Sequence, residues 1–249
     1  MKISQIYAVF DKYISMNIFY APSATIGSLI TLDENESTHC TRVLRLKAGE
    51  DITVMNGNGG LFTGQIVDPH PKRCTVSITE GTTHSVASPR IHIAIAPTKA
   101  IDRFEWFVEK SIEIGVSEIT PLLCQKSERK QINDERMDRL VVSAMKQSMQ
   151  LYKTKVNPLT KLSDVVKKCC ESQKLIAHCE PQEKLLLKTA CKPGVDTLVL
   201  IGPEGDFSVE EIAFALKNEF KAISLGDSRL RTETAGLVAC HSVMFINQK

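Results

Sequence analysis

The spacing of apolar residues along the chain changes near residue 90. Upstream, short stretches alternate apolar and polar positions, which is typical of strands that bury one face. Four such strands are predicted, at 28–32, 51–55, 61–67 and 74–79. The run Asn56–Gly60 predicts a hairpin turn because Asn and Gly tolerate positive φ angles. With one helix expected over 34–46, residues 16–88 are predicted to form a small β-rich domain of barrel or open-sheet type.

Downstream of Ser88-Pro89, continuous apolar strands alternate with amphipathic helices. The predicted strands are 91–96, 119–123, 175–178, 197–201 and 222–225. Helices are predicted over 103–114 and 135–151, and Gly115 is expected to end the first of them. This alternation predicts an α/β domain, residues 89–249, with a mostly parallel sheet covered by helices on both faces. Ligands in such domains bind beyond the carboxyl ends of the strands, so the candidate sites are the loops there.

Composition and charge exclude several classes of protein. The chain has 249 residues, of which 43% are apolar and 24% charged, and this excludes a disordered or fibrous protein. A net charge of +2 means that an RNA-binding surface would have to gather its positive charge locally. The eight cysteines show no C-x-x-C pair and no ligand spacing with histidine, which favours reduced thiols and no metal. Without a membrane span or a secretory signal, we expect a cytoplasmic protein, with residues 1–15 as an extension.

The first candidate loop is Gly202-Pro203-Glu204-Gly205, which follows a predicted buried strand. Its glycines allow the backbone to approach a ligand closely, and Ser208 with Glu211 predicts a capping box for the next helix. The loop matches neither a phosphate loop nor the G-x-G-x-x-G fingerprint of dinucleotide sites. Taken alone, it favours an ordinary β-turn slightly over a ligand site.

The second candidate loop spans 225–231 and precedes an apolar helix. Thr232 or Thr234 is expected to cap this helix, since both residue types are good N-caps. If the loop stood alone, Arg229 and Arg231 would be interpreted as a solvated surface pair.

The third candidate loop begins at His178, at the end of the predicted strand 175–178. A single histidine at such a position is more often a loop residue than a catalyst. The three loops together say more, because glycine- or proline-bearing loops at strand ends of one parallel sheet can converge on a single pocket.

The order of these motifs resembles that of a known family. Gly202–Gly205 followed by Leu225-Gly226 and then Leu230–Ala235 resembles the SPOUT (trefoil-knot) methyltransferases. The chain is most similar to the bacterial 16S ribosomal RNA uridine N3-methyltransferases, which modify U1498. The resemblance extends to further segments, namely Lys110–Val116, Pro121-Leu122, Ala144–Ser148, His39, Arg42–Arg45 and Gly57–Gly60.

The resemblance implies a PUA-like β-barrel domain followed by a SPOUT α/β domain whose carboxy-terminal part forms a trefoil knot. It also implies S-adenosylmethionine as methyl donor, 16S ribosomal RNA of the small subunit as partner, and a homodimer, with no role for DNA. The three loops would hold the cofactor. The implied cofactor-binding residues are His178, Cys179, Glu180, Ile201, Gly202, Pro203, Gly205, Leu225, Gly226, Leu230 and Thr234.

Two stretches of the loops depart from the family pattern. Asp206 stands where the family usually has a second glycine, and Asp227-Ser228 stand where it has Pro-Arg. The basic residue appears one place later, at Arg229. Near the start, Asn17 replaces an arginine that the family often carries, so an RNA contact is expected to be missing there.

Methylation of uridine at N3 requires an exposed base edge and loss of the N3 proton. We expect Arg231 to stabilise the anion that forms, and Glu204 or Glu233 to accept the proton. For Glu233 a role in stabilising the helix N-terminus is an equal alternative, and for Glu204 a role in the turn.

The RNA-binding candidates lie in both predicted domains. Arg42 and Arg45, three apart on the predicted helix, would lie near one face and meet phosphates, unless that face is simply solvated. Lys99 and Lys126 follow strand ends, and Arg229 lies in the second candidate loop.

Two alternative functions stay open at this point. The first is a SPOUT methyltransferase that acts on another RNA position, and the second is a non-catalytic protein for RNA binding or ribosome assembly. A nucleotide hydrolase is excluded, because the sequence has neither a phosphate loop nor an identifiable magnesium carboxylate.

Overall fold

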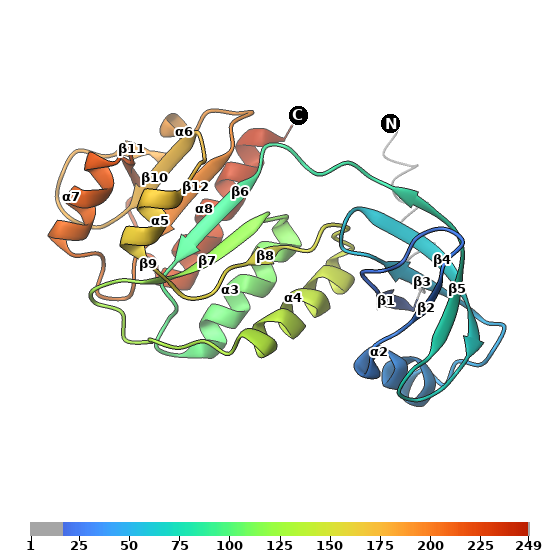
Figure 1. Cartoon of the computed structure of the whole chain (residues 1–249). Coiled ribbons are helices and arrows are strands. Elements are labelled where there is room, and N and C mark those ends of the chain that lie inside the picture. The colour runs from blue at the N-terminus through green and yellow to red at the C-terminus, as the bar shows by residue number, and fades with distance from the viewer. Residues whose placement is uncertain (1–16, 249) are drawn as a thin grey trace. The chain divides into compact units, whose positions relative to one another are not determined.

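The computed structural model describes residues 17–248 and divides the chain into two compact units, residues 1–86 and 87–249. The predicted extension over residues 1–15 lies outside the described residues. Unit one is built on a curled five-stranded sheet of order β1-β3-β4-β5-β2 (Figure 1). Its strands are β1 Ile18–Tyr20, β2 Leu29–Thr31, β3 Asp51–Met55, β4 Gly60–Asp68 and β5 Thr75–Thr83. The four strands predicted here are confirmed; β1, with three residues, is too short to give a pattern.

The helix expected over 34–46 is wrong in length and type. The structure has a short helix α2, Glu34–Thr38, followed by one π-helical turn η1, His39–Val43. Leu44 donates its backbone N–H to the His39 carbonyl, the wide i→i+5 bond of a π-turn, and Arg45 has a left-handed φ of 57°. Arg42 therefore lies in η1 and Arg45 beyond it, so the two arginines do not share a helical face.

Unit two contains an eight-stranded sheet of order β11-β13-β10-β12-β6-β7-β8, with β9 paired to β7. Every pairing in it is parallel. The strands are β6 Ile91–Ile95, β7 Glu118–Leu123, β8 Lys155–Val156, β9 Thr160–Lys161, β10 Gln173–Ala177, β11 Leu185–Leu186, β12 Thr197–Ile201 and β13 Lys221–Ser224. The five predicted strands and their parallel arrangement are confirmed, and β8, β9 and β11 are two-residue additions.

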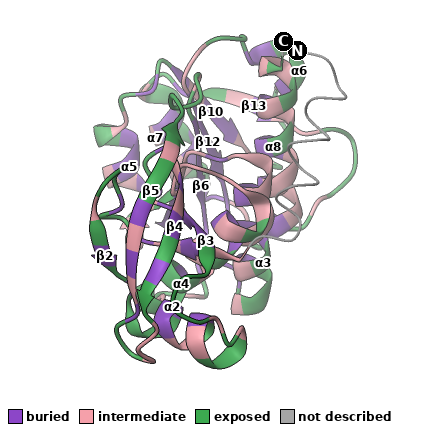
Figure 2. Ribbon diagram, turned by 90° about the vertical axis from the view of Figure 1, so that its right-hand side faces the viewer, coloured by how far each residue is buried: buried purple, intermediate pink, exposed green. Residues whose placement is uncertain are grey.

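Helices cover both faces of this sheet, as predicted. They are α3 Ile101–Ile114, α4 Asp134–Ser148, α5 Leu162–Lys168, α6 Leu187–Ala190, α7 Val209–Lys217 and α8 Thr232–Asn247. Alternate residues of β6 divide between the two layers: Ile93 packs with α3, α4 and α8, and Ala94 packs with α5 and α7. The buried central strands β10, β12 and β6 run between these layers (Figure 2).

The ends of the helices follow local chemistry only in part. Gly115 ends α3 with a φ of 102°, as expected. Helix α4 stops at Met149, with a φ of 57°, before the predicted end at residue 151. Within residues 17–248, no helix is both long and apolar enough to cross a bilayer.

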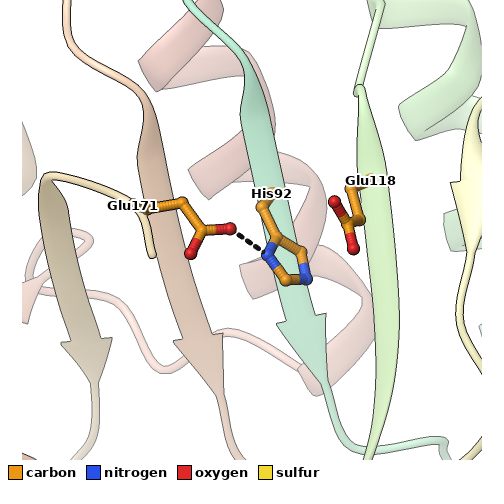
Figure 3. A group of neighbouring side chains, drawn as sticks. All are labelled: His92, Glu118 and Glu171. Carbon is orange, nitrogen blue, oxygen red and sulfur yellow. Dashed lines mark hydrogen bonds and ion pairs between the residues drawn. The ribbon is translucent and has the colours of Figure 1, made fainter. Parts of the chain in front are cut away.

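A buried polar network closes the amino-terminal edge of the sheet in unit two (Figure 3). Nδ1 of His92, on β6, lies 2.6 Å from Oε1 of Glu171, which precedes β10. Nε2 of His92 lies 2.8 Å from the hydroxyl of Thr120, on β7. Burial by itself would raise the pKa of Glu171, but the hydrogen bond and charge of His92 outweigh it and lower that pKa below its usual value.

Substitution of Glu171 by Gln is expected to destabilise the fold by about 1–3 kcal/mol at pH 7. A carboxylate with a lowered pKa stabilises the folded state above its unfolded pKa, and this contribution is lost as pH falls through the folded pKa. The difference between wild type and Glu171→Gln should therefore shrink below about pH 4. Urea unfolding at both pH values measures it.

Glu219→Gln provides the matched control, because it removes the same charge from an ion pair with Lys174 in which Glu219 is 88% exposed. It should change stability by less than about 0.5 kcal/mol at either pH. An equal loss for Glu171→Gln at pH 7 and at low pH would contradict the role assigned to its charge.

Candidate functional site

Three loops leave the same edge of the sheet from three neighbouring strands. Strand β10 pairs in parallel with both β12 and β13, and its last residue, Ala177, is level with Ile201 and Ile223. The loops that follow these strands are 178–180, 202–206 and 225–230. The structure thus brings together, at the carboxyl edge of the sheet, the three segments in which the sequence placed candidate chemistry (Figure 1).

Asp206 joins two of these loops. Its Oδ2 accepts a hydrogen bond of 2.7 Å from the backbone N–H of Cys179, and its Oδ1 accepts one of 2.8 Å from the N–H of Phe207. Its φ of 60° is left-handed, a conformation that glycine and, among other residues, aspartate tolerate best. The left-handed backbone agrees with the glycine of the family pattern at this position, and the carboxylate adds a link between the loops.

His178 is 6% exposed, and its Nδ1 is a buried atom with no hydrogen-bond partner. The side-chain amide of Gln182 lies 2.7 Å from Nε2, so in the orientation found here Nε2 accepts and Nδ1 carries the proton. Burial, and after it the charge of Lys184, lowers the pKa of His178, which keeps the ring neutral at pH 7. An unsatisfied buried N–H at this loop is a donor available to a ligand.

The glycines of the loops serve different purposes. A Cβ on Gly202 would lie 3.1 Å from the ring and backbone of Phe207, so a side chain here would press on Phe207 within the loop. Gly226 has a φ of 125° and open space where a Cβ would point. A Cβ on Gly205 would lie 3.5 Å from the Lys126 side chain. Of the three, Gly226 leaves the backbone most open to a ligand.

The remaining cofactor candidates lie on the same loops and strand ends. Ile201 and Pro203 are buried, Cys179 is exposed, and Glu180, Leu225 and Leu230 lie on the loops, with Thr234 in the first turn of α8. Lys184 holds the first of these loops, because its ammonium donates to the carbonyls of both His178 and Glu180 at 2.9 Å. Lys184 acts within the first loop, where no sequence motif marks it, and Asp206 acts through a contact between two loops, so neither role was predicted from the sequence.

The candidate catalytic residues differ in their surroundings. Oε1 of Glu204 accepts a hydrogen bond of 2.9 Å from the backbone N–H of Lys99, which fixes the carboxylate beside the turn. Glu233 is 7% exposed, in the first turn of α8. Arg231 is the exposed N-cap residue of α8, and its guanidinium has no polar partner within residues 17–248. The cap expected from Thr232 or Thr234 is wrong, because Arg231 is the N-cap residue and α8 starts without a side-chain cap.

The capping box predicted for α7 is confirmed: Ser208 and Glu211 exchange hydrogen bonds of 2.9 and 3.2 Å.

The cationic candidates around the turn differ in whether they contact the backbone of the turn. Lys126 donates to the carbonyls of Gly205 and Phe207 at 3.1 and 3.2 Å, so its charge holds the turn. Arg229 is exposed on its loop.

One group of described side chains is close enough to share a metal ion, and it lies at the opposite edge of the sheet. It consists of His92, Glu118 and Glu171 (Figure 3). Both ring nitrogens of His92 already have partners, and Glu118 accepts from the Lys155 ammonium at 2.9 Å. One oxygen of Glu171 is thus paired with His92, while its Oε2 is buried without a hydrogen-bond partner.

The chain matches two family models. The model described as an RNA methyltransferase domain matches residues 86–244, and the model described as an RNA methyltransferase PUA domain matches residues 32–79. These two matches correspond to the two units of the structure and agree with the predicted PUA-like and α/β domains.

Individual relatives agree with these matches over nearly the whole chain. A ribosomal RNA small subunit methyltransferase E of Buchnera aphidicola subsp. Acyrthosiphon pisum is 30% identical over 96% of this chain and 91% of its own. The crystal structure of a probable rRNA methyltransferase from Porphyromonas gingivalis has a TM-score of 0.85 and 38% identity, covering 93% of this chain and 98% of that one. The methyltransferase E of Neisseria gonorrhoeae, solved with S-adenosylmethionine, has a TM-score of 0.80 and 27% identity over the same shares.

The sheet edge with its three loops and the match over residues 86–244 therefore lead to the same conclusion. The chain belongs to the family of RNA methyltransferases that join a PUA domain to a methyltransferase domain.

Proposed function

We propose that this protein transfers the methyl group of S-adenosylmethionine to N3 of U1498 in 16S ribosomal RNA. The single observation that carries the proposal is the meeting of the three loops at one sheet edge, two of them joined by Asp206, in a chain similar to relatives named as small-subunit ribosomal RNA methyltransferases. The alternatives are another position in RNA and a non-catalytic role in ribosome assembly.

The residues present fit the cofactor. His178 offers a buried N–H without a partner, and Gly226 leaves its backbone open. These groups, with the main chain of 202–205, would hold S-adenosylmethionine by hydrogen bonds and close contact. When bound, the cofactor supplies an electrophilic methyl group on a sulfonium, so the protein has to supply orientation and electrostatics.

We assign proton acceptance to Glu204 and charge stabilisation to Arg231. Uridine N3 must lose its proton to become a nucleophile, and a carboxylate held by the Lys99 N–H stands oriented beside the turn to take it. The guanidinium of Arg231, without a partner in the described chain, would stabilise the negative charge left on the uracil. Glu233 lies in the first turn of α8, where its negative charge interacts favourably with the helix dipole, and we assign it that role instead.

RNA binding is proposed for both units, through Arg42 and Arg45 in the first and Lys99 and Arg229 in the second. The first pair would act as separate phosphate contacts, since Arg45 lies beyond η1. Lys126 would act by holding the turn. The homodimer and the trefoil knot that the resemblance implies stay predictions.

The direct test uses the purified protein with 16S ribosomal RNA, or with assembled small subunits, and S-adenosylmethionine. Digestion of the RNA and mass spectrometry of nucleosides should give N3-methyluridine, mapped to U1498. Methylation at another site would support the first alternative. Cofactor binding by calorimetry without any methyl transfer would support the assembly role.

Replacement of Arg231 by Ala should lower kcat by about 100-fold and leave the Kd for S-adenosylmethionine unchanged, because the charge acts on the substrate anion. Arg229→Ala removes the same charge from the same loop and should raise KM for RNA instead. Steady-state kinetics with calorimetry separate the two. Full methyl transfer by Arg231→Ala would disprove the electrostatic role.

Replacement of Asp206 by Gly should weaken cofactor binding by about tenfold, because the hydrogen bond from Cys179 to a charged acceptor is lost while the left-handed backbone is kept. Asp206→Asn keeps an acceptor oxygen and should restore most of the affinity. Calorimetry measures both variants. Equal affinities of Asp206→Gly and wild type would show that the link between the loops does not position the cofactor.

A further inference from the structure

Beside the three loops, the surface of unit two holds a basic cavity of about 410 Å³. It is lined by Lys99, Glu128, Arg129, Lys130 and Gln131. These residues come from the loops that follow β6 and β7, so the cavity opens on the same carboxyl edge of the sheet as the candidate site.

The cavity has an excess of positive charge. Lys99 forms an ion pair of 2.9 Å with Glu128, which balances the only carboxylate among the lining residues. Arg129 and Lys130 remain. Lys130 is exposed, and within the described chain no carboxylate pairs with it. A cavity with this balance favours an anion.

Arg129 is oriented before any ligand arrives. Its Nε donates to the Thr98 carbonyl at 3.1 Å and its Nη2 donates to the Lys99 carbonyl at 2.6 Å. A guanidinium has five N–H donors, so three of them stay available. Such a fixed, planar set of donors matches the oxygens of a phosphate.

The cavity also lies next to the proposed chemistry. The Lys99 backbone that lines it donates to Glu204 at 2.9 Å, and Lys126, five residues before Gln131, lies against Gly205. A strand of RNA whose phosphate occupied the cavity would therefore pass beside the turn that carries the proposed proton acceptor.

We propose that this cavity is a subsite for one backbone phosphate of the RNA substrate, bound by Arg129 and Lys130, and that it positions the strand that carries the target base. The proposal rests on the proposed function, since it takes the ligand of the site to be RNA. Phosphate contacts of this kind fix the register of a nucleic acid on a protein without reading its sequence.

Lys130→Gln tests the subsite, because it removes a charge from a side chain that holds no part of the fold. Arg129 is unsuitable, since its loss would free two carbonyls. Lys188→Gln, an equal change at an exposed residue of α6, is the matched control. The probe is a 16S ribosomal RNA fragment that contains U1498, titrated at several salt concentrations, with cofactor affinity measured in parallel.

Lys130→Gln should weaken RNA binding by about threefold to tenfold and lower the slope of log K against log salt by about 0.7–0.9, with no change in cofactor affinity. A neutral methylphosphonate at the contacted phosphate should weaken RNA binding to wild type. The same methylphosphonate should not weaken RNA binding to Lys130→Gln any further. Lys188→Gln should behave as wild type.

The proposal is overturned if Lys130→Gln keeps the wild-type salt slope, or if each methylphosphonate weakens wild type and Lys130→Gln equally. Its failure is distinguishable from that of the proposed function. If only the subsite proposal fails, wild type still binds the cofactor and methylates the RNA. If the proposed function fails, wild type shows no cofactor binding or no methyl transfer.

Discussion

The candidate site depends on the parallel pairing of β10 with β12 on one side and β13 on the other. The three strands are separated in sequence by about twenty residues each, and they become neighbours only because both faces of the sheet are buried under helices. Burial on both faces specifies the register, since a shift of one residue would exchange the side chains of the two layers. With the register set, the ends of the strands are level and their loops meet.

The loops have little regular hydrogen bonding of their own, and side chains supply it. Asp206 and Lys184 bind backbone groups of the first loop, and Lys126 binds those of the glycine turn. Charged groups used in this way act as supports for the main chain. Arg231 and Lys130 lack such contacts and are proposed to act on the substrate, together with Glu204 and Arg129, whose orientation is fixed by backbone contacts.

The two edges of the sheet in unit two differ in their polar groups. At the amino-terminal edge, Nδ1 of His92 pairs with Oε1 of Glu171 in a buried network, and Oε2 of Glu171 is buried there without a hydrogen-bond partner. At the carboxyl edge, His178 keeps a buried donor unsatisfied and Gly226 leaves backbone uncovered. A buried polar group without a hydrogen-bond partner costs free energy, and a ligand that bonds to it removes that cost.

The sequence by itself determined the elements whose cause is local. The apolar run of β12 predicts a strand buried on both faces, Gly115 predicts the end of α3, and Ser208 with Glu211 predicts the start of α7. Order and spacing of the glycine motifs were enough to indicate the family. These features could be predicted because each depends on residues only a few positions apart.

Only the tertiary structure decided the rest. The π-turn after α2, the two-residue strands and the early end of α4 have no periodic pattern to reveal them. The link from Asp206 to Cys179 spans 27 residues, and the contacts of Arg129 with Thr98 and Lys99 span about thirty. The folded sheet decides which charged side chains bond to the backbone and which do not, because it brings together residues far apart in the sequence. The spacing of residues along the chain does not show these contacts.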